Sequence, residues 1–137
     1  MPPNSPRRKV LIVEGEPTIR NVLFVLLAGL GCDGDVAADS KQALSMLRKE
    51  RFDAVLLDLR SSHLPPEEMF SSIIELRPTL VGRVLVIVGE VADPATMATL
   101  ERCAVPHISL THMASELRSR IRLLPGFAPG TTETPTR

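Results

Sequence analysis

Three acidic residues stand directly behind short apolar runs, and their side chains are the ones best placed to do chemistry. The runs cover residues 10–13, 54–57 and 84–89, and the acids that follow them are Glu14, Asp58 and Glu90. Short continuous apolar runs between turn signals are typical of strands buried on both faces, as in parallel sheets. Because functional groups of open parallel sheets collect at the carboxyl ends of the strands, we expect Glu14 and Asp58 to converge at one edge of such a sheet.

Two neighbouring carboxylates at such an edge could support phosphoryl transfer. A carboxylate oxygen can attack a phosphoryl group when a divalent cation neutralises the repulsion between them. Mg²⁺ commonly takes one or two carboxylates together with phosphate and water oxygens, at about 2.0–2.1 Å. Asp58 could instead cap the end of its strand or pair with an arginine, so the residue pattern alone leaves both interpretations open.

The segment after the first acid has the spacing of an amphipathic helix. Its apolar residues recur at i, i+3, i+4 and i+7, and they are Ile19, Val22, Leu23, Leu26, Leu27 and Leu30. Pro17 suits the first helical turn, where its missing N–H is no loss, and Gly29 and Gly31 supply a stop.

Four further helices are predicted. Ser40 is expected to cap the second, and the third opens at residues 65–68, runs through Leu76 and is ended by Pro78. Asp93 and Pro94 start the fourth. Thr111 is expected to cap the last helix, whose apolar residues are Met113, Leu117, Ile121 and Leu124.

Two weaker strands complete the pattern, one around residues 35–37 and one over residues 105–110. Strands and helices therefore alternate five times, which predicts an α/β fold around one parallel sheet. The domain is expected to cover residues 8–124. Residues 1–7 are expected to be a disordered N-terminal segment, and residues 125–137 a disordered tail without the apolar pattern to pack.

Composition excludes several classes of partner and compartment. Lys plus Arg equals Asp plus Glu at 16 each, so no basic field predicts nucleic-acid binding. No apolar run reaches the roughly 18 residues of a membrane span, and the charged N-terminus lacks a signal-type apolar core. Cys32 and Cys103 lie far apart without a C-x-x-C spacing, which predicts two unpaired core residues. We expect a cytoplasmic protein that binds neither nucleic acid nor membrane.

Two stretches carry a resemblance to a known family. Residues 9–17, KVLIVEGEP, and residues 52–60, FDAVLLDLR, resemble the receiver domain of bacterial two-component response regulators, across about residues 8–124. The resemblance implies a flavodoxin-like (βα)5 three-layer sandwich with strand order 2-1-3-4-5. It also implies that Asp58 is the phospho-acceptor position. A magnesium ion, if bound, would be held by Glu14, Asp58 and the carbonyl of Arg60.

The chain departs from the family pattern around that position. Gly15 replaces the second acid of the usual pair, Val88 replaces the Thr or Ser, and Leu110 replaces the Lys. His107 stands at the switching aromatic position. Further departures are Ser61, Ser62, Pro66 and Thr111. The loss of a hydroxyl donor and a cation removes contacts to a phosphoryl group, which carries about −1.5 to −2 charges near neutrality. Whether Glu16 or Glu90 substitutes for the missing acid stays open.

These departures favour a degenerate receiver, or pseudo-receiver. We expect a stand-alone signalling protein of a two-component or phosphorelay system that binds a sensor kinase, effector or scaffold with little or no phosphorylation. A homodimer through the face between the fourth and last helices is possible. The alternative is a conventional Mg²⁺-dependent receiver using Asp58. A third candidate is a small metal-dependent hydrolase using Glu14 and Asp58, but no nucleophile, base or substrate pocket supports it.

None of the three histidines is predicted to be catalytic. His63 is expected to be a solvated loop residue beside Asp58, His107 a half-buried strand residue, and His112 a surface residue. No Ser/His/Asp or Cys/His arrangement is suggested by spacing. We therefore expect no enzymatic activity and no cofactor, with Mg²⁺ needed only by the phospho-accepting alternative.

Overall fold

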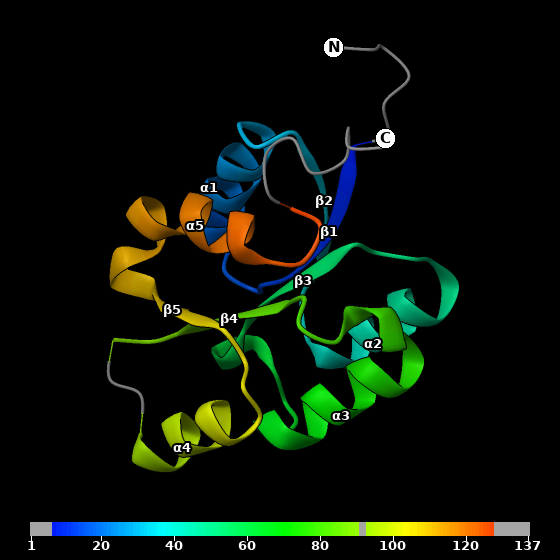
Figure 1. Cartoon of the computed structure of the whole chain (residues 1–137), viewed down its shortest axis with the longest axis vertical. Helices are drawn as coiled ribbons and strands as arrows, with labels where there is room; N and C mark the ends of the chain where they lie inside the picture. The colour runs from blue at the N-terminus through cyan, green and yellow to red at the C-terminus, as the bar shows by residue number, and fades with distance from the viewer. Residues whose placement is uncertain (1–6, 91–92, 128–137) are drawn as a thin grey trace.

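Five strands and five α-helices alternate along the chain in a computed structural model that describes residues 7–90 and 93–127 (Figure 1). The strands are β1 (Arg8–Val13), β2 (Cys32–Ala37), β3 (Ala54–Asp58), β4 (Val84–Val88) and β5 (His107–Ser109). The helices are α1 (Pro17–Ala28), α2 (Ser40–Lys49), α3 (Pro66–Leu76), α4 (Pro94–Arg102) and α5 (Met113–Leu123). Short 3-10 turns cover Leu59–Ser61, Pro78–Leu80 and Leu110–His112.

All strand pairs are parallel, and the sheet order is β2-β1-β3-β4-β5. The predicted fold class and strand order are therefore confirmed. The register aligns Val13 of β1 with Leu57 of β3, so the residues that follow these two positions reach the same edge of the sheet.

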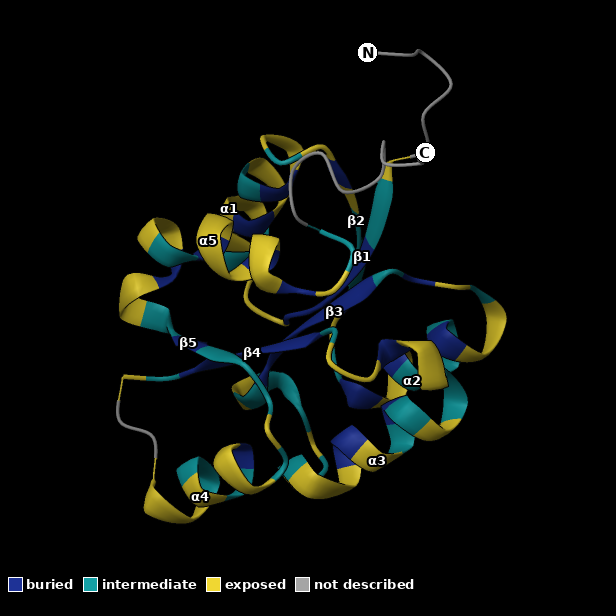
Figure 2. Ribbon diagram, in the orientation of Figure 1, coloured by how far each residue is buried: buried dark blue, intermediate teal, exposed yellow. Residues whose placement is uncertain are grey.

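The sheet is covered on both faces, which explains its continuous apolar runs. Alternate residues of β1 face opposite ways: Leu11 and Val13 pack with α2, α3 and α4, whereas Val10 and Ile12 pack with α1 and α5. Figure 2 shows most of β1, β3 and β4 buried between helices whose outer faces are exposed, whereas the edge strands β2 and β5 are less buried. Each cluster buries branched aliphatic side chains, and this burial is the main stabilising term of the fold.

Two strands differ in length from the prediction. β2 begins at Cys32, because its polar start pairs with β1 through Arg8 and Cys32. A Cβ at Gly34 would lie 2.9 Å from Cδ1 of Ile12, so a larger residue there would require that side chain to shift. β5 is shorter than residues 105–110, because Leu110 already belongs to a 3-10 turn.

Two predicted helix caps are wrong. Asp39, not Ser40, caps α2: its side chain accepts a hydrogen bond of 2.9 Å from the backbone N–H of Gln42. Ser40 is buried, and its hydroxyl accepts from the backbone N–H of His63. Thr111 does not cap α5, because it lies inside the turn Leu110–His112, which Ser109 caps.

The remaining helix starts follow the sequence signals. Pro17 and Pro94 open α1 and α4, and Asp93 caps α4 by accepting from the backbone N–H of Thr96 at 2.8 Å. Pro66 opens α3, which ends at Leu76, two residues before Pro78. These starts were predictable because proline and a capping side chain act within a single turn.

Asp39 gives a direct test of the observed cap. The Asp39→Ala variant should lose about 1 kcal/mol of unfolding free energy, because the N–H of Gln42 loses its acceptor. Asp39→Asn should retain most of the stability, and Lys41→Ala, at an exposed position of the same turn, should change little. Urea denaturation midpoints at constant m-value measure the difference. An asparagine variant as unstable as the alanine variant would contradict the capping role.

Residues beyond Leu124, the predicted end of the domain, still pack against the core. Phe127 contacts the core cluster beneath α1 and α5, and the Arg8 guanidinium lies 5.2 Å from the centre of its ring. Arg8 also donates a hydrogen bond to the carbonyl of Gly126. The predicted tail thus joins the domain over residues 125–127, and residues 1–6 and 128–137 lie outside the described part. Among the described helices, none has the length and hydropathy required to cross a membrane.

Candidate functional site

Glu14 and Asp58 meet at the carboxyl edge of the sheet, as the sequence predicts. Both are buried, with 1% of each residue exposed. Glu14 directly follows β1, where its backbone N–H donates to the carbonyl of Ala37 at 2.9 Å, and Asp58 ends β3. Two buried carboxylates at one edge form an acidic site whose charge must be balanced by a neighbour.

Arg60 supplies that balance. Its guanidinium donates from Nη2 to Oδ2 of Asp58 at 2.7 Å and from Nε to Oδ1 at 3.1 Å. The backbone N–H of Arg60 donates to Oδ1 at 2.9 Å, so Asp58 also caps the turn Leu59–Ser61. The pairing is bidentate, which is the strongest geometry between a guanidinium and a carboxylate.

The Arg60 guanidinium is the main site feature that the sequence interpretation did not assign. The sequence pattern predicts a role for the carbonyl of Arg60 alone and leaves pairing of Asp58 with an arginine as a general alternative. The available signal is the Asp-x-Arg spacing in a turn after a strand, which allows one residue to bind the carboxylate through both backbone and side chain.

The two carboxyl groups differ in their ionisation. Burial alone would raise the pKa of Asp58, but the hydrogen bonds and charge of Arg60 outweigh it and hold that pKa below its usual value. Burial and the adjacent Asp58 carboxylate raise the pKa of Glu14 to about 7. Asp58 is therefore a carboxylate at neutral pH, while Glu14 is divided between its protonated and ionised forms.

Neither of the other nearby acids joins the pair. Glu16 is exposed, and its side chain caps α1 by accepting from the backbone N–H of Thr18 at 2.6 Å. Glu90 is exposed on the far side of Arg60 and accepts from the hydroxyl of Thr111 at 3.3 Å. Neither side chain forms a hydrogen bond with the side chain of Glu14 or Asp58, although Glu16 lines the same cleft as these two residues.

A cleft of about 330 Å³ opens over the pair. The residues that line it are Glu14, Gly15, Glu16, Ala38, Asp58, Arg60, Ser61 and His63. Within it, Oε2 of Glu14 accepts from the backbone N–H of Glu16, whereas Oε1 has no hydrogen-bond partner among the described residues. The Ser61 hydroxyl accepts from the backbone N–H of Gly15 at 2.9 Å and so joins the two loops.

The side chains present do not fit a divalent cation in this arrangement. Both Asp58 oxygens face the Arg60 guanidinium, which occupies the region where a cation would share them. Within residues 7–90 and 93–127, no group of three or more His, Cys, Asp or Glu side chains has the geometry to hold a metal ion. Magnesium binding by Glu14, Asp58 and the Arg60 carbonyl would require the guanidinium to leave.

Two of the three switch positions, Val88 and Leu110, lie beside Arg60. Val88 ends β4 and is 6% exposed, and Leu110 follows β5. Both line a second hollow of about 550 Å³ that also includes Arg60 and Glu90. His107 is half-buried in β5, in agreement with the prediction, and lies opposite Val86 rather than in the hollow. The end of β4 therefore presents an isopropyl group, and the end of β5 an isobutyl group, to the Arg60 side of the site.

The remaining candidate residues lie outside the acidic pair. His63 is exposed at the rim of the cleft and His112 is exposed at the start of α5, as expected for both. Nδ1 of His112 lies 2.9 Å from the Ser109 hydroxyl. Cys32 is a buried free thiol, and Cys103 is a free, partly exposed thiol.

Known proteins resemble this chain in both sequence and fold. The "DNA-binding response regulator MtrA" of Mycolicibacterium smegmatis is 42% identical over 53 residues, which are 39% of this chain and 23% of MtrA. The "probable transcriptional regulator ycf27" of Porphyridium aerugineum is 30% identical over 118 residues, 85% of this chain and 47% of that protein. The chain thus spans about half or less of the length of these relatives.

Solved structures and a family model agree with that similarity. A CheY-like response regulator receiver domain protein of Methanospirillum hungatei superposes with a TM-score of 0.74 at 19% identity, covering 85% of this chain and 92% of the other. A putative response regulator of Chloroflexus aurantiacus gives 0.74 at 19% identity, with 85% and 96% covered. The model of the response regulator receiver domain matches residues 10–122. This chain belongs to the response regulator receiver domain family of two-component signalling.

Proposed function

We propose that this receiver domain signals by binding a protein partner and does so with little or no phosphorylation of Asp58. The observation that carries the proposal is the bidentate contact of Arg60 with Asp58, in which both acceptor oxygens already bind a cation belonging to the chain itself. A phosphoryl donor approaching Asp58 would have to displace this guanidinium and restore a divalent cation before its charge could be neutralised.

The surroundings of Asp58 add to that barrier. Gly15 offers no carboxylate ligand, Val88 no hydroxyl and Leu110 no ammonium group. Each missing charged hydrogen bond to a partly buried phosphoryl group costs about 1.5–3 kcal/mol. A phosphoryl group without such contacts would distinguish poorly between two conformations, and a ligand without differential contacts shifts no equilibrium.

The faces of α1 and α5 offer a surface for a partner. Val22, Val25 and Leu123 are exposed by 37%, 71% and 75%, although they are large apolar residues. The two helices cover the same face of the sheet (Figure 1). The exposed arginines at 118, 120 and 122 on α5 would favour a partner with acidic residues around an apolar contact. A sensor kinase, an effector or a scaffold are the partner classes that the proposal includes.

A conventional Mg²⁺-dependent receiver is the second candidate. The favourable observation is that Glu14 and Asp58 do converge, with Oε1 of Glu14 unpaired among the described side chains. In that case Arg60 would swing out toward solvent, which its 47% exposed side chain permits. MtrA, a longer protein, is described as DNA-binding. For the domain described above, the proposed partner is a protein.

Beryllofluoride with magnesium separates the two candidates. The expected result is that ¹H–¹⁵N spectra of the protein at millimolar Mg²⁺ show no shifts centred on Asp58 and Glu14 when beryllofluoride is added. The Arg60→Ala variant should gain a response to Mg²⁺, because the carboxylate loses its competing cation. Asp58→Asn serves as the baseline for non-specific shifts. Saturable shifts around Asp58 in the unmodified protein would establish the conventional receiver instead.

A further inference from the structure

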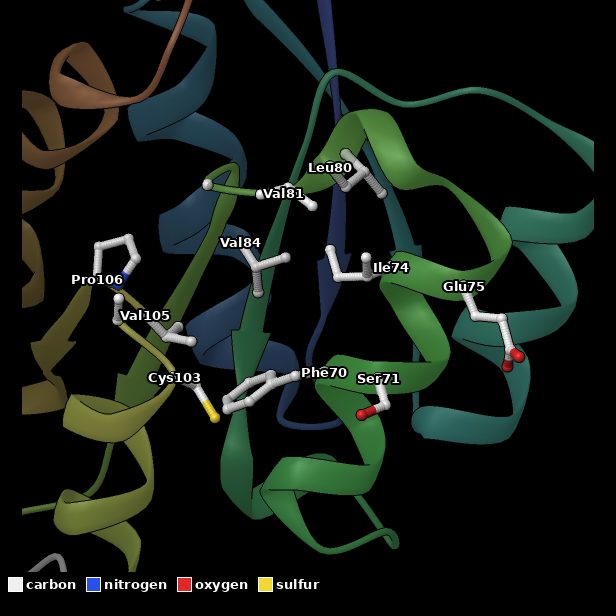
Figure 3. Close-up of a pocket in the computed structure, with 12 residues that line it drawn as sticks. Phe70, Ser71, Ile74, Glu75, Leu80, Val81, Val84, Cys103, Val105 and Pro106 are labelled. Atoms are coloured by element: carbon white, nitrogen blue, oxygen red, sulfur yellow. The ribbon is translucent and has the colours of Figure 1, made fainter.

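A separate groove of about 550 Å³ lies at the opposite end of the sheet from Asp58. Its walls are α3, the connection from α3 to β4, and the loop between α4 and β5 (Figure 3). The Phe70 ring points from α3 toward Cys103 of that loop, and Val84 at the start of β4 lies above both in this view. The residues of this groove take no part in the acidic site.

The lining is apolar with a single charged side chain. Ile74, Cys103, Val105 and Pro106 line the groove as partly exposed residues, and the core residues Phe70 and Val84, exposed by 7% and 6%, form its floor. Glu75 is the charged residue, and none of the described residues that line the groove is a Lys, Arg or His. A carboxylate or phosphate ligand would lose water contacts here without finding a cationic partner, whereas a neutral ligand would not.

Hydrogen bonds hold the backbone on both sides of the groove in place before any ligand binds. The loop turns at Ala104, whose φ of 55° places it in the left-handed region. Hydrogen bonds hold both sides of that turn: Cys103 N–H donates to the carbonyl of Thr99 at 2.9 Å, and Val105 N–H to that of Leu100 at 2.9 Å. On the other wall, Arg83 N–H donates to the carbonyl of Leu80 at 2.9 Å. A preformed cavity lowers the ordering cost of binding.

Its size and surroundings favour a small molecule over a protein. Ligand pockets for small molecules measure about 300–1,000 Å³, and this groove falls within that range. A stable protein interface buries about 800 Å² on each partner around an apolar centre. Val81, which is 62% exposed, is the one large apolar side chain at the rim of the groove that is strongly exposed among the described residues. The other exposed large apolar residues of the described part lie on α1 and α5.

We propose that the groove between α3 and the α4–β5 loop binds a small aromatic molecule that carries no negative charge. The Phe70 ring would contact the ligand ring in an edge-to-face or offset arrangement, and the aliphatic walls would bury its remaining surface. The polar side chain at the margin is that of Ser71, whose hydroxyl would accept a hydrogen bond from a ring N–H or an amine, whereas the Glu75 carboxylate points outward (Figure 3).

Indole and benzoate test the proposal as a matched pair, since they are a neutral and an anionic aromatic probe. The chain has no Trp and no Tyr, so the emission of added indole can be followed without protein background. Indole emission should shift to shorter wavelength in a saturable manner as protein is added. An unsaturable or absent shift would overturn the proposal.

Alkylation of Cys103 by iodoacetamide locates the bound probe. At an indole concentration ten times its dissociation constant, the alkylation rate of Cys103 should fall about tenfold, as measured by mass spectrometry of its peptide. Cys32 is the internal control, because it is 4% exposed and burial raises the pKa of its thiol. Benzoate at the same concentration should protect Cys103 far less, and equal protection by both probes would contradict the charge argument.

A blocking variant completes the test without disturbing the core. Ser71 is exposed on α3 and lines the groove, so the indole ring of Ser71→Trp should cover it. In this variant the alkylation rate of Cys103 should no longer respond to added indole. Glu68→Trp, on an exposed position of the same helix outside the groove, should keep the response. Protection retained in Ser71→Trp and lost in Glu68→Trp would place the bound indole elsewhere.

Discussion

The Glu14→Gln variant is expected to be more stable than the unmodified protein at pH 8, by on the order of 2 kcal/mol, with little difference at pH 4. The reason is that burial and the neighbouring Asp58 carboxylate raise the pKa of Glu14 to about 7, against an ordinary value of 4.5. Ionised Glu14 therefore destabilises the fold, and a neutral amide of the same shape removes that charge.

The sign of the pH dependence follows from proton binding. Between pH 4.5 and about 7 the folded protein retains the Glu14 proton while the unfolded chain releases it. The unfolded state then binds fewer protons, so the contribution of Glu14 to stability falls as pH rises through this window and levels off above it. Below pH 4.5 both states are protonated and the contribution vanishes.

Urea denaturation at pH 4, 6 and 8 measures this effect in Glu14→Gln, in the unmodified protein and in Glu16→Gln. The last variant is the matched control, because it makes the same change two residues away at an exposed side chain and keeps an acceptor oxygen for Thr18. A stability difference between Glu14→Gln and the unmodified protein that does not change with pH would contradict the elevated pKa.

Removal of the Arg60 guanidinium should have the second large effect. The Arg60→Ala variant is expected to lose about 2 kcal/mol of unfolding free energy at pH 7, because the buried Asp58 carboxylate keeps only one backbone donor from residue 60. This loss of unfolding free energy is smaller than the loss expected for a fully buried ion pair. The reason is that 47% of the Arg60 side chain is exposed and solvent screens part of its charge.

The pH profile distinguishes a lost ion pair from lost packing. Arg60 lowers the pKa of Asp58 in the fold, so the stability that it contributes is present above the ordinary pKa of 3.8 and disappears as pH falls through the lower folded value. Arg60→Ala and the unmodified protein should therefore converge in strong acid. A constant deficit at all pH values would indicate that the aliphatic stem of Arg60 carries the effect.

Arg102 provides the matched control for Arg60. It pairs with Glu67 at 3.2 Å, but both side chains are more than half exposed, at 57% and 62%. Such surface pairs contribute about 0–1 kcal/mol, so Arg102→Ala should change stability less than Arg60→Ala does. Equal losses in the two variants would show that burial of Asp58 does not set the strength of its contact.

Local signals in the sequence were sufficient for the order of elements and for the meeting of the two acids. Pro17, Pro94 and Asp93 act within one helical turn, so their effect does not depend on distant contacts. Glu14 and Asp58 converge because the carboxyl ends of parallel strands share one sheet edge. Glycine has no acidic side chain in any fold, so the missing acid at Gly15 could be identified from the sequence alone.

Tertiary structure decided which groups neutralise and cap one another. Asp39 caps α2 in place of Ser40 because the Ser40 hydroxyl is buried against the backbone of His63, a contact 23 residues away. The Arg60 guanidinium reaches Asp58 only because the 3-10 turn after β3 brings residue 60 back over the strand end. The groove between α3 and the α4–β5 loop likewise depends on how these two segments pack against each other. Sequence spacing thus placed the backbone and allowed the contact between Asp58 and Arg60, two residues apart. The partner of Ser40 and the walls of the groove were set by packing between distant segments, which no local pattern encodes.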